Sequence, residues 1–224
     1  MDAVSARTRA AYDLVIFDCD GVLVDSEALS CRCLLRQLQR HGIDVGLDAV
    51  LERFLGRSIT AVADHFQALG RVMPAGFTAE LRALVRKSFA DSLQAIADVE
   101  SVLRSLEIAY CVASSSDIER VNFSLQLTGL SALFAGRVFT AQMVQSGKPA
   151  PDLFLHAAAS MDVEPGRTLV VEDSVSGVQA GKAAGMTVWG FVGGSHYASR
   201  DGRTVLAAAG ADRVFDRMAD FRHH

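Results

Sequence analysis

The feature that most constrains this chain is a short apolar run over residues 14–17 that ends abruptly in acid. Leu-Val-Ile-Phe is followed directly by Asp18, Cys19, Asp20 and Gly21. A run of this length with β-branched residues is typical of a strand that is buried on both faces of a parallel sheet. Because carboxylates are costly to bury, their position directly after the strand indicates a functional loop.

Three further apolar runs resemble the first, over residues 108–113, 168–171 and 186–191. Between them lie stretches with helical spacing of apolar residues, over 99–106, 117–128, 151–160 and 175–184. Strands that alternate with helices of this length predict a parallel sheet with helices on both faces. The sequence therefore predicts an α/β fold.

One long segment breaks this alternation. Residues 27–89 contain no convincing strand pattern, and they begin with apolar residues at helical spacing: Cys31, Leu34, Leu35 and Leu38. Gly42 ends that helix, and further helical patterns over 61–69 and 80–89 are separated by Pro74 and Gly76. We expect a core domain over residues 12–24 and 93–224, an inserted helical domain over 25–92, and a flexible leader over 1–11.

Reactive side chains follow the strands of the predicted sheet. In an open parallel sheet such groups gather at the carboxyl ends of the strands. Those ends and one connecting loop carry two carboxylate pairs, a serine cluster and a lysine: Asp18, Asp20, Ser114, Ser115, Ser116, Lys148, Glu172 and Asp173. Phosphoryl transfer needs a nucleophile, an acid, hard oxygen ligands for a divalent cation, and donors for the phosphoryl oxygens. The set contains all of these.

These residues fall into four motifs. The motifs are Asp18-x-Asp20-Gly21-Val22-Leu23-Val24-Asp25-Ser26, then Val112-Ala113-Ser114, then Gly147-Lys148-Pro149-x-Pro151-Asp152, and finally Val170-Val171-Glu172-Asp173-Ser174-x-x-Gly177. In order and spacing they resemble the four signatures of the haloacid dehalogenase superfamily, and the resemblance covers residues 12–220. The insert resembles the helical cap of the subgroup that includes β-phosphoglucomutase and sugar phosphatases. The resemblance implies a Rossmann-like core with such a cap.

The resemblance also implies a role for each core residue. Asp18 is expected to attack phosphorus, Asp20 to act as general acid and base, and Lys148 to neutralise negative charge beside them. Ser114 and Ser115 are expected to bind the phosphate. A Mg²⁺ cofactor is expected on Asp18, Asp20, Glu172 and Asp173. The ordinary alternatives are turn serines, a surface lysine, and acidic residues that favour a helix N-terminus.

Substrate specificity is expected from the insert and from one loop of the core. Gly56 and Arg57 resemble the substrate-specificity loop of the family, with a solvated arginine as the alternative. His196 follows a strand, and we expect it near the rim of the same cleft.

The predicted function is Mg²⁺-dependent hydrolysis of a small phosphate monoester, a sugar phosphate by family analogy, through an aspartyl-phosphate. A phosphomutase is the nearest alternative, but Ser30 stands where the mutase pattern has a histidine, and Ile59 stands where it has an arginine. A catalytically silent binding protein with the same fold is a second alternative. Phosphonate cleavage is a third, and it requires a Schiff-base lysine in the insert, where Lys87 is the only lysine.

Charge and composition bear on partners and compartment. A formal charge of −4 gives no electrostatic reason to expect nucleic acid or an anionic membrane as a partner. No apolar run approaches the roughly 20 residues that span a bilayer. The four cysteines show no disulfide framework or zinc pattern. We expect a cytoplasmic protein, a monomer or weak homodimer, that binds a small-molecule phosphate ester.

Overall fold

The computed structural model describes residues 11–55 and 59–223. Its centre is a six-stranded parallel sheet in the order β3-β2-β1-β4-β5-β6. The strands are β1 Leu14–Phe17, β2 Ala109–Ser114, β3 Val138–Thr140, β4 Thr168–Glu172, β5 Thr187–Phe191 and β6 Arg213–Phe215. The predicted α/β, Rossmann-like fold is therefore confirmed, with two edge strands, β3 and β6, that the sequence pattern did not indicate. Each has three residues, too few for a periodic signal.

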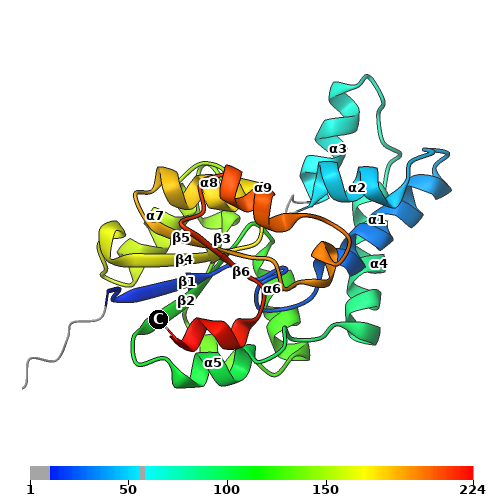
Figure 1. Ribbon diagram of the computed structural model, residues 1–224. Helices are drawn as coiled ribbons and strands as arrows, with labels where there is room; N and C mark the ends of the chain where they lie inside the picture. Colours follow the sequence, from blue (N-terminus) through cyan, green and yellow to red (C-terminus); the bar gives the residue numbers. More distant parts are fainter. Residues whose placement is uncertain (1–10, 56–58, 224) are drawn as a thin grey trace, which may run out of the picture.

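Helices cover both faces of the sheet (Figure 1). One face carries α7 Asp152–Ser160, α8 Val175–Ala183 and α9 Gly202–Ala208, and the other carries α5 Val99–Ser105, α6 Ile118–Leu127 and a 3₁₀ segment over Met218–His223. Successive side chains of β1 alternate between the two layers, as the period of a strand requires. Leu14 and Ile16 join the apolar cluster under α7 and α8, whereas Val15 and Phe17 join the other one.

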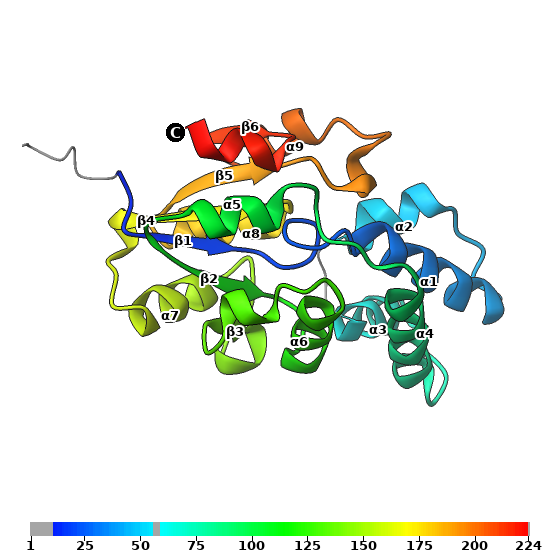
Figure 2. The same ribbon diagram turned by 90° about the horizontal axis from the view of Figure 1, so that it is seen from below.

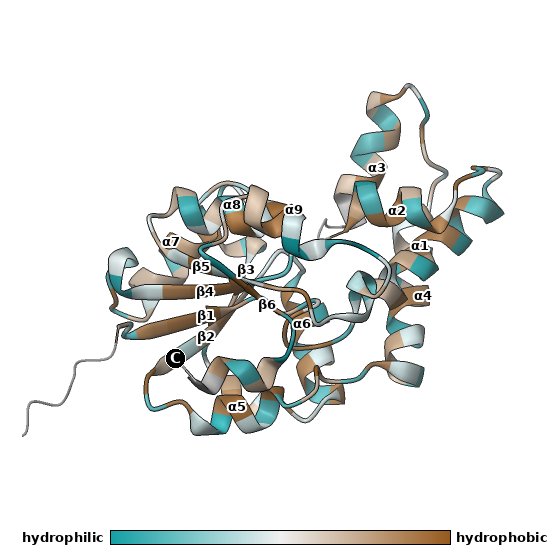
Figure 3. Cartoon of the chain, viewed as in Figure 1, coloured by the Kyte–Doolittle hydropathy of each residue, from teal (hydrophilic) through white to brown (hydrophobic). Residues whose placement is uncertain are grey.

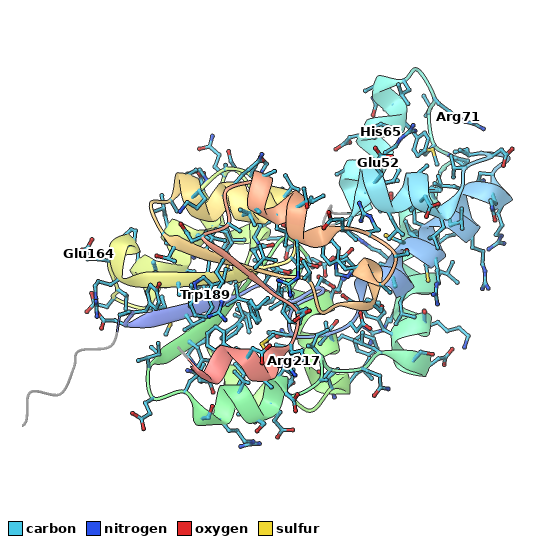
Figure 4. All side chains as sticks on the ribbon, viewed as in Figure 1. Glu52, His65, Arg71, Glu164, Trp189 and Arg217 are labelled. Atoms are coloured by element: carbon cyan, nitrogen blue, oxygen red, sulfur yellow. The ribbon has the colours of Figure 1, made fainter. Side chains whose placement is uncertain are left out.

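Both faces of the sheet are apolar, so the strands have no polar side. β1 and the middle of β4 are coloured as hydrophobic in Figure 3, and every residue of both strands is buried. On one face the indole of Trp189 packs against the aromatic rings of Tyr12, Phe215 and Phe221. Figure 4 shows Trp189 within the core, apart from Glu52 and His65 on the insert.

The described part of the insert between β1 and α5 is helical, as the sequence predicts. Its helices are α1 Glu27–Arg40, α2 Leu47–Phe54, α3 Ile59–Ala68 and α4 Phe77–Ser92. The helix α2 was not expected, although its apolar residues Leu47, Val50, Leu51 and Phe54 have helical spacing. In Figure 2 the arrowheads of β1 and β2 point toward these helices, so the insert lies beyond the carboxyl edge of the sheet.

The chain enters and leaves the insert through two adjacent segments. Val24 and Ala95 form an antiparallel bridge. The amide of Asp25 donates to the carbonyl oxygen of Gln94 (2.9 Å), and the amide of Ile96 donates to the carbonyl oxygen of Leu23 (2.9 Å). These contacts tie residues 23–25 to residues 94–96. The domain boundaries themselves stay a prediction.

Other expectations concern cysteines and membranes. All four cysteines are buried thiols without a disulfide, which agrees with the sequence. Within the described residues, no helix combines the length and apolar character that crossing a bilayer requires.

Candidate active site

The predicted reactive side chains meet at one edge of the sheet. Phe17 pairs in register with Val112 of β2 and Val171 of β4, so Asp18 lies level with Ala113 and Glu172, and Ser114 lies one residue beyond. The amide of Asp18 donates to the carbonyl of Val171 (2.9 Å), which extends this alignment by one residue. Parallel register thus brings Asp18, Ser114 and Glu172 together from sequence positions that are far apart.

Lys148 lies between two of these carboxylates. Its Nζ donates to Asp18 Oδ1 (2.5 Å), to Glu172 Oε1 (2.5 Å) and to the carbonyl oxygen of Ala113 (2.9 Å). Only 2% of its side chain is exposed. Burial lowers the pKa of Lys148, but attraction to Asp18 and Glu172 outweighs burial and raises it. Lys148 is therefore a fixed cation at the centre of the site.

The charged form of Asp18 is disfavoured, whereas that of Lys148 is favoured. Burial raises its pKa well above the usual value, and the nearby carboxylates Glu172, Asp173 and Asp20 raise it further, against the attraction of Lys148. The site therefore holds more negative charge than Lys148 neutralises by itself.

Both oxygens of Glu172 are occupied. Oε1 accepts from Lys148, and Oε2 accepts from the amide (3.1 Å) and the hydroxyl (2.9 Å) of Ser174. Ser174 also caps α8, because its hydroxyl accepts from the amide of Gly177 (3.0 Å). A Cβ at Gly177 would lie 1.9 Å from the Glu172 carboxyl carbon, so the first turn of α8 approaches this carboxylate as only glycine permits.

Asp20 receives three hydrogen bonds from side chains. Oδ1 accepts from Ser26 (2.6 Å) and from Arg120 Nη2 (2.8 Å), and Oδ2 accepts from Ser116 (2.7 Å). Burial raises the pKa of Asp20, but Arg120 and the two serines outweigh it, and the net shift is downward. Asp20 is therefore a carboxylate in this arrangement.

The three serines at the end of β2 and directly after it have different surroundings. The hydroxyl of Ser114 is buried and accepts from the amide of Ser116 (3.0 Å), so it shapes the turn. Ser116 holds Asp20, and Ser115 is half-buried at the same cavity. All three line the cavity, so the expected phosphate-binding role of Ser114 and Ser115 stays a prediction.

Asp173 is surrounded by close packing. The carbonyl oxygen of Asp173 accepts from the hydroxyl of Tyr197 (2.6 Å). A Cβ at Gly21, which has a positive φ of 79°, would lie 1.8 Å from Asp173 Oδ2. Gly21 thus serves both the turn after β1 and the space that Asp173 needs.

The position expected for His196 is wrong. Its side chain is fully buried behind Asp173, with Nε2 at 3.1 Å from Asp173 Oδ2, and not at an open rim. Burial lowers the pKa of this imidazole, against the attraction of Glu27 and Asp25. The loop after β5 folds back over the site because Ser195 donates to Asp25 through its amide (3.0 Å) and its hydroxyl (2.8 Å). The other expected specificity residues, Gly56 and Arg57, lie outside the described residues.

A cavity joins the edge of the sheet to the insert. On the sheet side it is lined by charged and hydroxyl groups that include Asp18, Asp20, Lys148 and Asp173. On the insert side its polar residues are Glu27 and Ser30, and its apolar residues are Cys31, Leu34, Phe54, Val62, Leu81 and Val85.

Sequence reasoning missed two polar groups of this cavity, Arg120 and Glu27. Burial, followed by the charges of Asp173 and Asp20, raises the pKa of Glu27 to about 7. Arg120 lies in the first turn of α6, where the helix dipole disfavours a cation. That local conflict was the available signal that Arg120 has a partner elsewhere.

The charge balance of the site bears on the expected Mg²⁺. Four carboxylates, those of Asp18, Asp20, Glu172 and Asp173, face the two cations Lys148 and Arg120. Asp173 Oδ2 is buried and forms no hydrogen bond in the described part of the chain, although His196 Nε2 lies 3.1 Å away, and burial and then the Glu172 charge raise the pKa of Asp173 well above its usual value. An additional cation would offset the excess of negative charge and would give Asp173 Oδ2 an electrostatic partner.

The described residues contain no group of three or more His, Cys, Asp or Glu side chains arranged to hold a metal ion. Mg²⁺ does not need such a group, because it usually takes one or two carboxylates and completes its shell with waters and substrate phosphate. The donor set fits Mg²⁺ on Asp18 and Asp173. It fits Glu172 less well, since both of its oxygens already accept hydrogen bonds.

Comparison with known proteins places the chain in a family. The family model of haloacid dehalogenase-like hydrolases matches residues 12–185. A haloacid dehalogenase-like protein from Agrobacterium tumefaciens superposes with a TM-score of 0.83 at 34% identity, covering 95% of this chain and 96% of that one. A family hydrolase from Deinococcus radiodurans, solved with phosphate and sodium bound, gives 0.76 at 32% identity, covering 95% and 94%. The chain therefore belongs to the haloacid dehalogenase-like hydrolases.

Similar proteins within this family are named as phosphatases. 6-Phosphogluconate phosphatase from Escherichia coli is 33% identical over 186 residues, which are 82% of this chain and 84% of that protein. Hexitol phosphatase B, also from E. coli, is 29% identical over 86% of this chain and 88% of its own length. Together with the family they identify this chain as a phosphoric monoester hydrolase.

Proposed function

We propose that this chain is a Mg²⁺-dependent phosphatase that hydrolyses a small phosphate monoester through an aspartyl-phosphate on Asp18. The observation that carries the proposal is the pairing of two aspartates with opposite environments on one cavity. Asp18 lies against Lys148, and Asp20 is held by Ser26, Ser116 and Arg120. On this ground we assign attack to Asp18 and proton transfer to Asp20.

In the first step an oxygen of Asp18 attacks phosphorus and the bond from phosphorus to the leaving oxygen breaks. Lys148 holds Oδ1 of Asp18, so the second oxygen is available to attack. The leaving oxygen takes a proton from Asp20. Asp20 is ionised in this arrangement, so it takes up a proton from solvent as the substrate binds. The approach of a phosphate dianion favours this uptake, because the added negative charge beside the carboxylate raises its pKa.

In the second step a water molecule attacks phosphorus and the bond to Asp18 breaks. Asp20 takes the proton of that water, and inorganic phosphate leaves. Mg²⁺ held by Asp18, Asp173 and the main-chain carbonyl of Asp20 would neutralise charge on the phosphoryl oxygens. Ser114 and Ser115 with the neighbouring amides would bind the same oxygens, and Glu172 would orient Lys148 and the start of α8.

The substrate class that we propose is a sugar phosphate or a similar polyol phosphate. It rests on relatives that are named for 6-phosphogluconate and for hexitol phosphates, and on a site that is closed over by the insert. We propose further that residues 25–92 form a cap domain over the core, and that the protein works in the cytoplasm as a monomer or weak homodimer.

The test is a panel of phosphate monoesters with the purified protein, in Mg²⁺ and in excess chelator. We expect inorganic phosphate from sugar and polyol phosphates in Mg²⁺, none in chelator, and recovery when Mg²⁺ is restored. Full activity in chelator would contradict the metal assignment. With a hexose 1-phosphate and a bisphosphate primer, isomerised sugar phosphate that forms faster than free phosphate would show a mutase instead.

A further inference from the structure

Arg120 connects the core to the insert at the point where proton transfer is proposed. Its Nη2 donates to Asp20 Oδ1 (2.8 Å) and to the hydroxyl of Ser30 (3.0 Å). Asp20 follows β1 of the core, whereas Ser30 belongs to α1 of the insert. One nitrogen of the guanidinium therefore spans the boundary between the two regions.

The guanidinium is held in a defined orientation. Its Cζ lies 4.9 Å from the centre of the Phe89 ring on α4, and its side chain is 18% exposed. The backbone amide of Arg120 donates to Asp117 Oδ1 (2.9 Å), the cap of α6, which fixes the start of that helix. Nε is buried without a hydrogen-bond partner among the residues that the structure describes. The side chain is thus placed by packing and by its bonds to Asp20 and Ser30.

This placement distinguishes the two oxygens of Asp20. A carboxylate oxygen accepts about two hydrogen bonds. Oδ1 already accepts two, from Ser26 and Arg120, whereas Oδ2 accepts one, from Ser116. The remaining lone pair for a substrate is therefore on Oδ2, and rotation of the carboxylate would break the bonds of Oδ1.

We propose that Arg120 is a positioning residue that fixes Asp20 so that Oδ2 faces the leaving oxygen, and that Ser30 makes this placement depend on the insert. The inference rests on the proposed phosphatase function and extends it. The reaction does not consume Arg120, and no proton leaves it. Its contribution is confined to the two proton transfers of Asp20, to the leaving oxygen in the first step and from the attacking water in the second.

Because Arg120 acts only through Asp20, its loss should slow most the substrates whose leaving group needs a proton. A purely structural role would not produce this difference between substrates. An alkyl phosphate releases a strongly basic alkoxide and needs a proton from the enzyme, whereas p-nitrophenyl phosphate releases a weakly basic phenolate that needs little help. Arg120→Met keeps most of the side-chain volume and removes the donor. The two substrates differ only in the first step, so its rate is measured as release of the leaving group in a single turnover. We expect this rate to fall about 100-fold with an alkyl phosphate, within the range for general acid catalysis. With p-nitrophenyl phosphate we expect the same rate to fall less than about threefold.

Three further variants complete the experiment. Ser30→Ala should give the same selectivity with a smaller loss, about threefold on the alkyl phosphate. It removes the acceptor of Arg120 on the insert and the bond from Ser30 to the carbonyl oxygen of Ser26 (2.9 Å), but it leaves the bond from Arg120 to Asp20 in place. Arg86→Met is the matched control, since Arg86 on α4 also crosses to the core, over the ring of Phe123 (3.9 Å), but does not line the cavity. Arg86→Met should leave the rates with both substrates unchanged. Low concentrations of guanidinium should restore alkyl phosphate turnover to Arg120→Ala.

Several results would overturn the inference. Equal losses of the first-step rate on both substrates would make Arg120 a structural or phosphate-binding residue. Weaker binding of the alkyl phosphate with an unchanged single-turnover rate at saturation would make it a contact of the leaving group. No loss on either substrate would remove it from the reaction. If Arg120→Met fails to fold, the ratio of the rates of Ser30→Ala with the two substrates tests the proposal. The proposed function is tested separately, by hydrolysis in the wild-type protein and its dependence on Asp18.

Discussion

The edge of the sheet and the helical insert face the same cavity with different side chains. The edge contributes Asp18, Asp20, Lys148 and Asp173, and the insert contributes Glu27, Ser30 and six apolar residues. The charged groups at the edge are fixed by hydrogen bonds that reach the buried strands, such as the bond from Lys148 to the carbonyl of Ala113. The insert is held largely by apolar packing, in a cluster that continues from the core into its helices.

This difference separates chemistry from access. Charges that are held in place before substrate arrives need no reorganisation during the reaction, which is the main source of electrostatic catalysis. Apolar packing is less directional, so a wall built from it tolerates change in shape and in substrate. We therefore expect substitutions at the edge to remove activity, and substitutions in the insert to alter stability and selectivity.

The largest effect is expected for Asp18→Asn at the edge. The amide is a poor nucleophile, so release of phosphate should fall by at least about 1,000-fold. Thermal unfolding should occur at the same or a higher temperature, because the change removes one of several carboxylates that repel each other in a buried site. Turnover within about tenfold of wild type, with contamination ruled out, would contradict the covalent mechanism.

Lys148→Met should reduce both activity and stability. It leaves Asp18 and Glu172 buried without their shared cation, which typically costs about 3–5 kcal/mol of unfolding free energy. Activity should fall about 100-fold or more. Lys182→Met is the matched control, because Lys182 pairs with Asp212 at the surface (2.7 Å), and it should cost less than about 1 kcal/mol. Urea unfolding of both variants measures the difference, and equal costs would refute the assignment of Lys148.

Glu27→Gln tests a buried carboxylate of the insert through pH. The pKa of Glu27 is raised from 4.5 to about 7, by burial first and then by Asp173 and Asp20, while His196 and Arg120 act in the opposite direction. A raised pKa in the folded state gives stability that is complete below 4.5 and is lost as pH rises through about 7. Glutamine does not ionise. The variant should therefore gain up to about 3 kcal/mol relative to wild type as pH rises.

Urea unfolding at about pH 4.5 and about pH 8 measures this change. Glu52→Gln, at an exposed position of α2, is the control and should leave the pH dependence of unfolding as it is in wild type. A Glu27→Gln protein whose stability follows the wild-type pH profile would show that Glu27 stays ionised at the cavity.

The smallest effect on chemistry is expected for Val85→Ala in the apolar wall. Val85 is buried, and losing two methyl groups should cost about 2 kcal/mol of unfolding free energy. Hydrolysis of p-nitrophenyl phosphate should change less than about threefold, because no charged group moves. A loss as large as that of Lys148→Met would abolish the separation between the two regions.

The sequence by itself determined the fold class and the location of the site. The four apolar runs correspond to β1, β2, β4 and β5 within a residue or two, and the helical insert lies where the alternation is interrupted. Asp18, Lys148 and Glu172 are in contact as expected, because the loops at the carboxyl ends of parallel strands lie at one edge of the sheet. These features depend on local periodicity and on a rule of topology, which a single sequence contains.

Only the tertiary structure decided the surroundings of each reactive group. Arg120 is separated from Asp20 by 100 positions, and their contact depends on how α6 packs between the sheet and the insert. The burial of His196 depends on the loop after β5 closing over Asp173, and the engagement of Glu172 depends on the cap of α8. Hydrogen bonds of this kind are set by the relative placement of whole elements to within about an ångström. No local pattern in a sequence carries that information.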